Sequence, residues 1–174
     1  MNKGYVHVYT GDGKGKSTAA FGLALRAVGA GKKVYIGQFM KTGDYHEVKA
    51  ILQYLPMIRL EPYGNGCLIL GRPPEEADYA AARAGLEKAR AALTKDRYDV
   101  VILDEINITS HLGLIQEQDV LDLIHTKPLS AELILTGRYA TDKVLQQADL
   151  VTHMTEVKHY YHTDGVLARD GIER

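Results

Sequence analysis

The stretch that decides the fold is Gly11-Asp12-Gly13-Lys14-Gly15-Lys16-Ser17-Thr18. It follows a short β-rich run at residues 5–9, and the residues from Ser17 to Gly29 then have the pattern of a helix. A glycine loop between a strand and a helix is the context that a phosphate-binding P-loop requires. We therefore expect a nucleotide site at the end of the first strand.

Each residue type in this loop has a chemical task. The glycines allow successive backbone N–H groups to face a polyphosphate, Lys16 supplies a positive charge, and the Ser17 hydroxyl can ligate Mg²⁺. We expect ATP to contact every residue of the loop: Gly11, Asp12, Gly13, Lys14, Gly15, Lys16, Ser17 and Thr18. The general pattern G-x-x-x-x-G-K-[ST] asks for glycine where this chain has Thr10, so hydrolysis at the γ-phosphate is less well supported than nucleotide binding. A glycine-rich turn that binds nothing is the alternative.

Apolar runs of strand length alternate with helical patterns along the whole chain. Strands are expected at residues 34–39, 98–103, 132–136 and 150–154, and helices at residues 45–54, 75–93, 117–125 and 141–148. This alternation predicts a three-layer α/β fold of the P-loop NTPase type, with a mainly parallel sheet and helices on both faces. We expect one domain over residues 1–174, and a surface loop from Pro56 to Pro74.

Two carboxylates end a second apolar strand, in Asp99-Val-Val-Ile-Leu-Asp104-Glu105. Parallel sheets place their ligands at the carboxyl ends of the strands, so Asp104 and Glu105 are expected to hold Mg²⁺ (or Mn²⁺) together with Ser17. A helix N-cap or a solvated strand end is the alternative for this pair. Arg138 follows another strand and can reach a phosphate of ATP, although an exposed arginine after a strand explains it equally well.

Composition excludes several functional classes. Lys and Arg total 21 against 22 Asp and Glu, a formal net charge of -1, which predicts no attraction to nucleic acid or to an anionic membrane. The chain has one cysteine, Cys67, no run that resembles a signal peptide and no apolar run of the roughly 20 residues that a spanning helix needs. We therefore expect a protein of the cytoplasm.

The chain resembles the P-loop type of corrinoid adenosyltransferase, nearly from end to end. The matching stretches are Thr10 to Gly22, Gln38-Phe39-Met40-Lys41, Leu103-Asp104-Glu105, Leu135-Thr136-Gly137-Arg138, Glu156-Val157-Lys158-His159 and Gly171-Ile172-Glu173. The shortened loop is itself typical of that family. Where family members often carry a Gly-Phe-x-Trp stretch whose aromatic rings contact the corrinoid, this chain has Gly64-Asn65-Gly66-Cys67-Leu68, and it contains no Trp.

The resemblance implies a reaction as well as a fold. Family members transfer the 5′-deoxyadenosyl group of ATP to the Co(I) of cob(I)alamin or a related corrinoid such as cobyrinic acid a,c-diamide, and release triphosphate. By resemblance, Lys16 and the loop amides hold the triphosphate, Ser17 and Glu105 hold the metal, and Lys16 and Glu105 are the residues that catalysis depends on most. A homodimer in cobalamin biosynthesis is implied too, with a reductase that supplies Co(I).

Two other functions stay open at this point. A P-loop ATPase or phosphotransferase would act on the γ-phosphate of ATP, and a regulator without catalytic activity would bind ATP only. The products formed from ATP and reduced corrinoid separate the three hypotheses.

Overall fold

The computed structural model describes residues 3–64 and 72–173. Six strands form one sheet in the order β3-β2-β4-β5-β1-β6, and every neighbouring pair is parallel. The strands are β1 (Val6–Thr10), β2 (Val34–Phe39), β3 (Ile58–Tyr63), β4 (Val100–Asp104), β5 (Glu132–Thr136) and β6 (Leu150–His153). The expected parallel sheet is confirmed.

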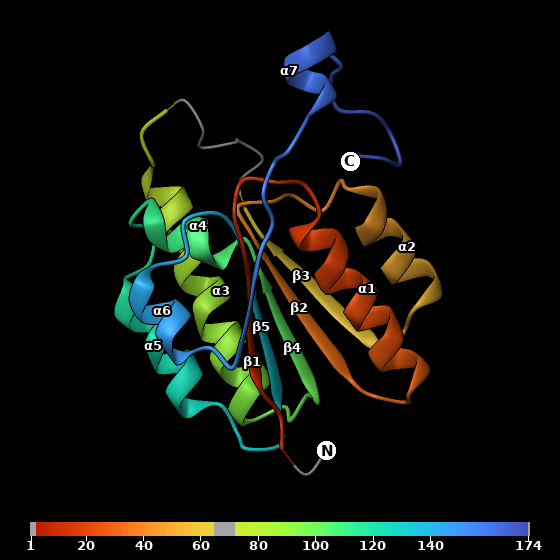
Figure 1. Cartoon of the computed structure of the whole chain (residues 1–174). Helices are drawn as coiled ribbons and strands as arrows, with labels where there is room; N and C mark the ends of the chain where they lie inside the picture. Colours follow the sequence, from red (N-terminus) through yellow and green to blue (C-terminus); the bar gives the residue numbers. More distant parts are fainter. Residues whose placement is uncertain (1–2, 65–71, 174) are drawn as a thin grey trace.

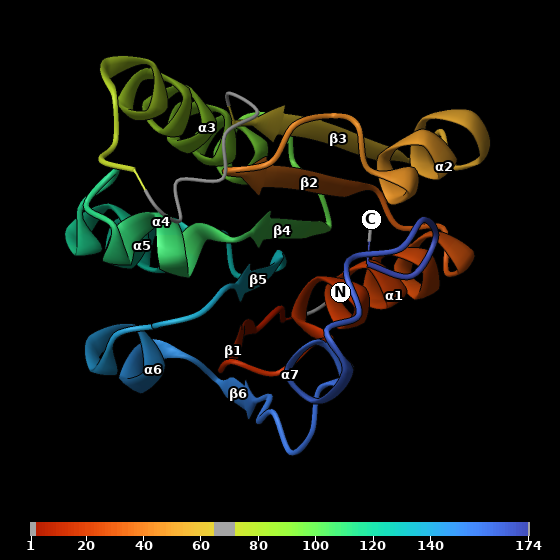
Figure 2. The ribbon, with the colours of Figure 1, turned by 90° about the horizontal axis from the view of Figure 1, so that it is seen from above.

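Helices cover both faces of this sheet, as the two perpendicular views show (Figures 1 and 2). One face carries α1 and α2, and the other carries α3, α4, α5 and α6. The helices are α1 (Lys16–Gly29), α2 (His46–Tyr54), α3 (Glu76–Thr94), α4 (Ile106–His111), α5 (Glu117–Thr126), α6 (Asp142–Gln147) and α7 (Tyr160–Asp164). This arrangement confirms the three-layer α/β fold.

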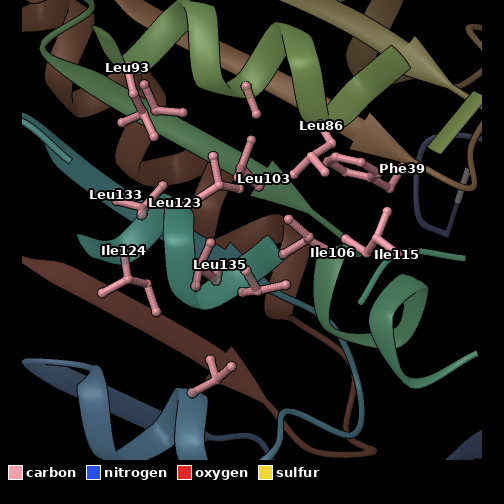
Figure 3. Close-up of a cluster of buried hydrophobic side chains, with 14 of the residues drawn as sticks. Phe39, Leu86, Leu93, Leu103, Ile106, Ile115, Leu123, Ile124, Leu133 and Leu135 are labelled. Atoms are coloured by element: carbon pink, nitrogen blue, oxygen red, sulfur yellow. The ribbon is translucent and has the colours of Figure 1, made fainter. Parts of the chain in front are cut away.

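The central strands are mainly apolar because helices cover both of their faces. Every residue of β2 and β4 is buried, and one cluster of buried side chains fills the space between the sheet and α3 and α5, including Leu103, Leu123 and Leu135 (Figure 3). On the opposite face, α1 buries small residues at helical spacing, Ala20, Ala24 and Ala27. Small side chains let the backbone of α1 lie close to the sheet, directly after the glycine loop.

The expected surface loop from Pro56 to Pro74 is wrong over residues 58–63, which form β3. Within the described residues this strand pairs with β2 alone, so it lies at the edge of the sheet, where Pro62 is tolerated because no further strand needs an N–H donor at that position. Ile58 and Leu60 are buried while Arg59 between them is exposed. Alternating burial of this kind indicates a strand. The glycines and prolines around it favour a loop, which is why the sequence predicted one here.

Two short helices, α4 and α7, were not expected. α4 begins at Ile106, directly after the two carboxylates, and α7 belongs to a C-terminal segment that lies above the carboxyl edge of the sheet (Figure 1). None of the helices in the part of the chain that the structure describes has the length and apolar character needed to cross a bilayer.

Candidate functional site

The glycine loop (residues 11–18) folds around the side chain of its own lysine. Lys16 Nζ donates hydrogen bonds to the carbonyl oxygens of Gly11 and Gly13, both at 2.7 Å, and the residue is only 7% exposed. Burial lowers the pKa of the Lys16 ammonium, against the opposing charges of Glu105 and Asp12. The loop is therefore shaped around a desolvated cation, which an incoming anion can neutralise.

The backbone directly after β6 leaves no room for a side chain at Gly11 or Gly13. The Gly13 amide donates to the carbonyl oxygen of Met154 at 2.7 Å, and a Cβ atom at Gly11 would lie 2.4 Å from that same oxygen. Gly11 also has a φ of 98°, which favours glycine. Both positions therefore need glycine because the backbone after β6 passes directly over the loop.

Asp104 ends β4 and is fully buried. The Thr136 hydroxyl donates to its Oδ1 at 2.7 Å, and Lys41 Nζ donates to its Oδ2 at 2.8 Å. Burial by itself would raise the pKa of the Asp104 carboxyl, but the charge of Lys41 and the hydrogen bonds from Lys41, Thr136 and Ser17 outweigh it and lower the pKa. Asp104 is therefore a charged carboxylate held in one orientation.

Glu105 lies beside it in a different environment. Its φ of 62° is left-handed, a conformation that non-glycine residues adopt rarely, and its backbone N–H donates to Thr136 Oγ1 at 3.0 Å. Burial, and then the charge of Asp104, raise the pKa of the Glu105 carboxyl despite the nearby cations Lys41, Lys16 and Arg138. Two adjacent carboxyl groups thus have pKa values shifted in opposite directions.

Lys41 connects the two halves of the site. It follows β2, and its Nζ lies 3.3 Å from Ser17 Oγ as well as 2.8 Å from Asp104 Oδ2. Burial opposes the charged form of Lys41, but the charge and hydrogen bond of Asp104 raise the pKa of the ammonium above its ordinary value. One partly buried cation therefore joins the start of α1 to the end of β4.

A cavity of about 610 Å³ opens above these residues. Its walls come from the glycine loop and α1, from the segment between β2 and α2, from the ends of β4 and β5, and from the C-terminal segment. The lining residues are Asp12, Gly13, Lys14, Gly15, Lys16, Ser17, Thr18, Phe21, Lys41, Tyr45, His46, Glu47, Glu105, Arg138, Glu156, His159, Gly171, Ile172 and Glu173. The volume falls in the range of small-molecule sites.

Comparison with known proteins assigns this architecture to a family. Residues 2–174 match the family described as ATP:corrinoid adenosyltransferase BtuR/CobO/CobP. The chain belongs to the ATP:corrinoid adenosyltransferase family. It is 34% identical over 177 residues to the corrinoid adenosyltransferase of Escherichia coli K12, an alignment that covers 98% of this chain and 86% of the relative. Similar relatives are corrinoid adenosyltransferase CobA of Salmonella typhimurium, 34% identical with 98% and 86% covered, and corrinoid adenosyltransferase of Pseudomonas aeruginosa, 33% identical with 98% and 84% covered.

In this member of the family, the cavity brings together most of the residues predicted from the sequence. Asp12 to Thr18, Glu105 and Arg138 all line it. Two predicted residues lie behind its wall instead. Gly11 contributes a carbonyl oxygen to Lys16, and Asp104 is covered by Lys41 and Thr136. Arg138 is about half exposed and lies 3.4 Å from the carbonyl oxygen of Asp12, at the rim of the glycine loop.

The oxygen atoms of this site suit a hard divalent cation. Ser17 offers a hydroxyl, and Asp104 and Glu105 offer carboxylates, which are the donors that Mg²⁺ and Mn²⁺ prefer. Lys41 already places a positive charge against two of these three residues. Gln38 Nε2 donates to Asp104 Oδ2 at 3.4 Å, and the buried Oε1 of Gln38 has no hydrogen-bond partner among the described residues. Glu105 lines the cavity and Asp104 does not, so Glu105 is the carboxylate that a cation in the cavity could contact directly.

Two parts of the site were not predicted from the sequence. Lys41 follows β2 at the carboxyl edge of the sheet, where ligands bind in folds of this class. That position is the sequence signal that could have identified it as a site residue. The C-terminal wall, with Glu156, His159 and Glu173, lies in two of the stretches that resemble the family, but no local pattern of strands or loops places these residues against the glycine loop. The stretch Gly64 to Leu68, expected to bear on corrinoid contacts, lies outside the described residues from Asn65 onward.

Proposed function

We propose that this chain transfers the 5′-deoxyadenosyl group of ATP to the Co(I) of a corrinoid, cob(I)alamin or cobyrinic acid a,c-diamide, and releases triphosphate. The observation that carries the proposal is the cavity that joins the glycine loop to Glu105 in a chain that belongs to the ATP:corrinoid adenosyltransferase family. In this reaction the electron pair of Co(I) forms the bond to C5′ of the ribose. The C5′–O5′ bond breaks, and its electron pair leaves with the triphosphate.

No proton moves at the reacting carbon, so the site needs no general base. The protein has to align cobalt, C5′ and O5′ and to stabilise the negative charge that grows on the triphosphate. We assign the second task to Lys16 and the amides of the glycine loop, with Lys14 and Arg138 beside them in the lining of the cavity. Losing one such donor from a comparable site costs roughly 3 to 4 kcal/mol in barrier.

We propose Mg²⁺ or Mn²⁺ as the cofactor, held by Ser17 and Glu105 with Asp104 behind them. When bound, the ion supplies positive charge against the leaving triphosphate. Before metal binds, Lys41 and Thr136 keep Asp104 ionised, and its carboxylate also interacts with the Ser17 hydroxyl.

The partners beyond ATP and corrinoid are also proposals. Co(I) requires a reductase to supply it, and the single cysteine is compatible with a reducing cytoplasm. A homodimer is supported by the exposure of all four residues of β6, a strand that pairs on one side with β1 only. A second copy of the chain would cover that edge.

Product analysis tests the proposed reaction. With ATP, Mg²⁺ and chemically reduced corrinoid, ³¹P spectra should show triphosphate rising in step with the absorbance of the cobalt–carbon bond, and no matching amount of ADP. Corrinoid left as Co(III) is the control, because it lacks the nucleophile and should give no triphosphate. An ATPase would release ADP and phosphate with either corrinoid and without one. A regulator would bind ATP and give neither product.

A further inference from the structure

Lys41 contacts both Ser17 and Asp104, and the proposed reaction assigns it no role. We propose that Lys41 is a positioning residue whose ammonium occupies the cation site before substrates bind. When the divalent metal binds there, the ammonium moves into the cavity and contacts the triphosphate. This role rests on the proposed function, because it requires a metal and a triphosphate in this cavity.

The first step follows from the atoms that Lys41 contacts. Its ammonium lies 3.3 Å from Ser17 Oγ and 2.8 Å from Asp104 Oδ2, which are oxygens of two of the three proposed metal-binding residues. A divalent ion on Ser17 uses the same lone pairs of the hydroxyl oxygen. Two cations on one pair of oxygens repel each other strongly in a largely buried site. Metal and Lys41 therefore compete for this position.

The second step follows from where the side chain can go. Lys41 lies two residues after the end of β2, and a flexible four-carbon stem carries its ammonium. Behind Lys41 lies the fully buried Asp104, and in front of it lies the cavity that Lys16 and the glycine loop also line. A displaced ammonium can therefore enter the cavity, where the triphosphate is proposed to lie. The positive charge of Lys41 then acts on the leaving group.

Metal binding by the free protein tests the first step without any turnover. Mn²⁺ is titrated into the wild type, Lys41→Met and Lys41→Arg in the absence of ATP, and bound Mn²⁺ is measured by electron paramagnetic resonance. Lys41→Met should bind Mn²⁺ about tenfold more tightly than the wild type, because the competing cation is gone, and Lys41→Arg should stay close to the wild type. Lys49→Met is the matched control, since Lys49 lies exposed on α2.

ATP affinity at saturating Mn²⁺ tests the second step. Lys41→Met should bind ATP about tenfold more weakly than the wild type, because one cation near the triphosphate is lost. The two changes thus have opposite signs, whereas a merely structural role of Lys41 weakens both affinities. If Lys41→Met does not fold, as circular dichroism would show, Mn²⁺ should restore its folding by replacing the ammonium beside Asp104.

Several results overturn the role of Lys41. If folded Lys41→Met binds Mn²⁺ as tightly as the wild type or more weakly, Lys41 does not compete with the metal. If its ATP affinity equals that of the wild type, the Lys41 ammonium does not act on the triphosphate. A Lys41→Met chain that stays unfolded at saturating Mn²⁺ also contradicts the proposal. Wild type that binds Mn²⁺ but gives no triphosphate with Co(I) corrinoid overturns the proposed reaction alone. Wild type that binds no Mn²⁺, with or without ATP, overturns the metal site and the role of Lys41 together.

Discussion

Lys14 and Glu173 are 159 positions apart in the sequence, and Nζ of Lys14 donates to Oε1 of Glu173 at 2.8 Å. The same ammonium donates to the carbonyl oxygen of Ile172 at 2.8 Å. Glu173 also accepts from Arg169 and from the hydroxyl of Tyr160. The end of the chain is thus tied to the glycine loop by one carboxylate that several donors share.

We predict that Glu173→Gln loosens the C-terminal segment. The neutral amide cannot stabilise the charges of Lys14 and Arg169 together, so residues 156–173 should exchange amide hydrogens faster and be cleaved faster by trypsin. Hydrogen exchange measured by mass spectrometry is the check. Glu76→Gln is the control, because Glu76 forms an exposed ion pair with Arg83 on α3, away from this segment. Unchanged exchange in residues 156–173 would show that the carboxylate does not hold them.

Lys16→Ala should lose most of the thermal stabilisation that Mg²⁺-ATP gives the wild type. A ligand that binds only the folded state stabilises it by about 2.7 kcal/mol at a concentration 100 times its Kd, so a loss of affinity appears directly as a smaller shift in Tm. The measurement is a thermal melt with and without Mg²⁺-ATP. Lys143→Ala is the control, since Lys143 pairs with Glu117 on the surface. Equal shifts for Lys16→Ala and the wild type would remove Lys16 from the nucleotide site.

The sheet was predictable because its central strands obey a simple rule. β2 and β5 are mainly apolar segments of five or six residues, and both are predicted with their observed bounds. β3 was not, because an edge strand with Pro62 carries only three residues of clear alternation. Sequence patterns report burial, so strands at the edge of a sheet give weaker signals than strands at its centre.

The site was predictable where a local sequence pattern marks its residues. The glycine loop has its own local pattern, and the pair Asp104-Glu105 follows a recognisable strand. The opposite pKa shifts of that pair depend on Lys41, Thr136 and burial, which the fold supplies from other strands. Contacts such as the one between Lys14 and Glu173 have no local signal, because they form only when the fold is complete.

Substitutions that create a cavity in the core below the site should lower the stability of the fold. Leu135 on β5 is fully buried among the side chains shown in Figure 3, one residue before Thr136, which holds Asp104. We predict that Leu135→Ala lowers the free energy of unfolding by about 2–5 kcal/mol. Urea denaturation measures the change, with Leu129→Ala as the control because Leu129 is 68% exposed. A similar loss for both variants would contradict the assignment of Leu135 to the core.

The raised pKa of Glu105 predicts two opposite effects of Glu105→Gln. Without metal, the folded wild type binds a proton on Glu105 more tightly than the unfolded chain does, so stability falls as pH rises from the ordinary glutamate value through the raised one. Glu105→Gln has no such loss and should melt at a higher temperature than the wild type at neutral pH. In saturating Mn²⁺ the order should reverse, because only the wild type keeps the carboxylate ligand.

The same shift sets the pH at which metal binding fails. Mn²⁺ needs the ionised carboxylate, so its affinity for the wild type should fall as pH drops through the raised pKa of Glu105, at a higher pH than for a glutamate with its ordinary pKa. Glu105→Gln should need about 10–100-fold more Mn²⁺ and lack this pH dependence. Titrations of Mn²⁺ at several pH values decide the question. An identical profile in Glu105→Gln would move the ligand role from Glu105 to Asp104, whose lowered pKa keeps it charged at more acidic pH.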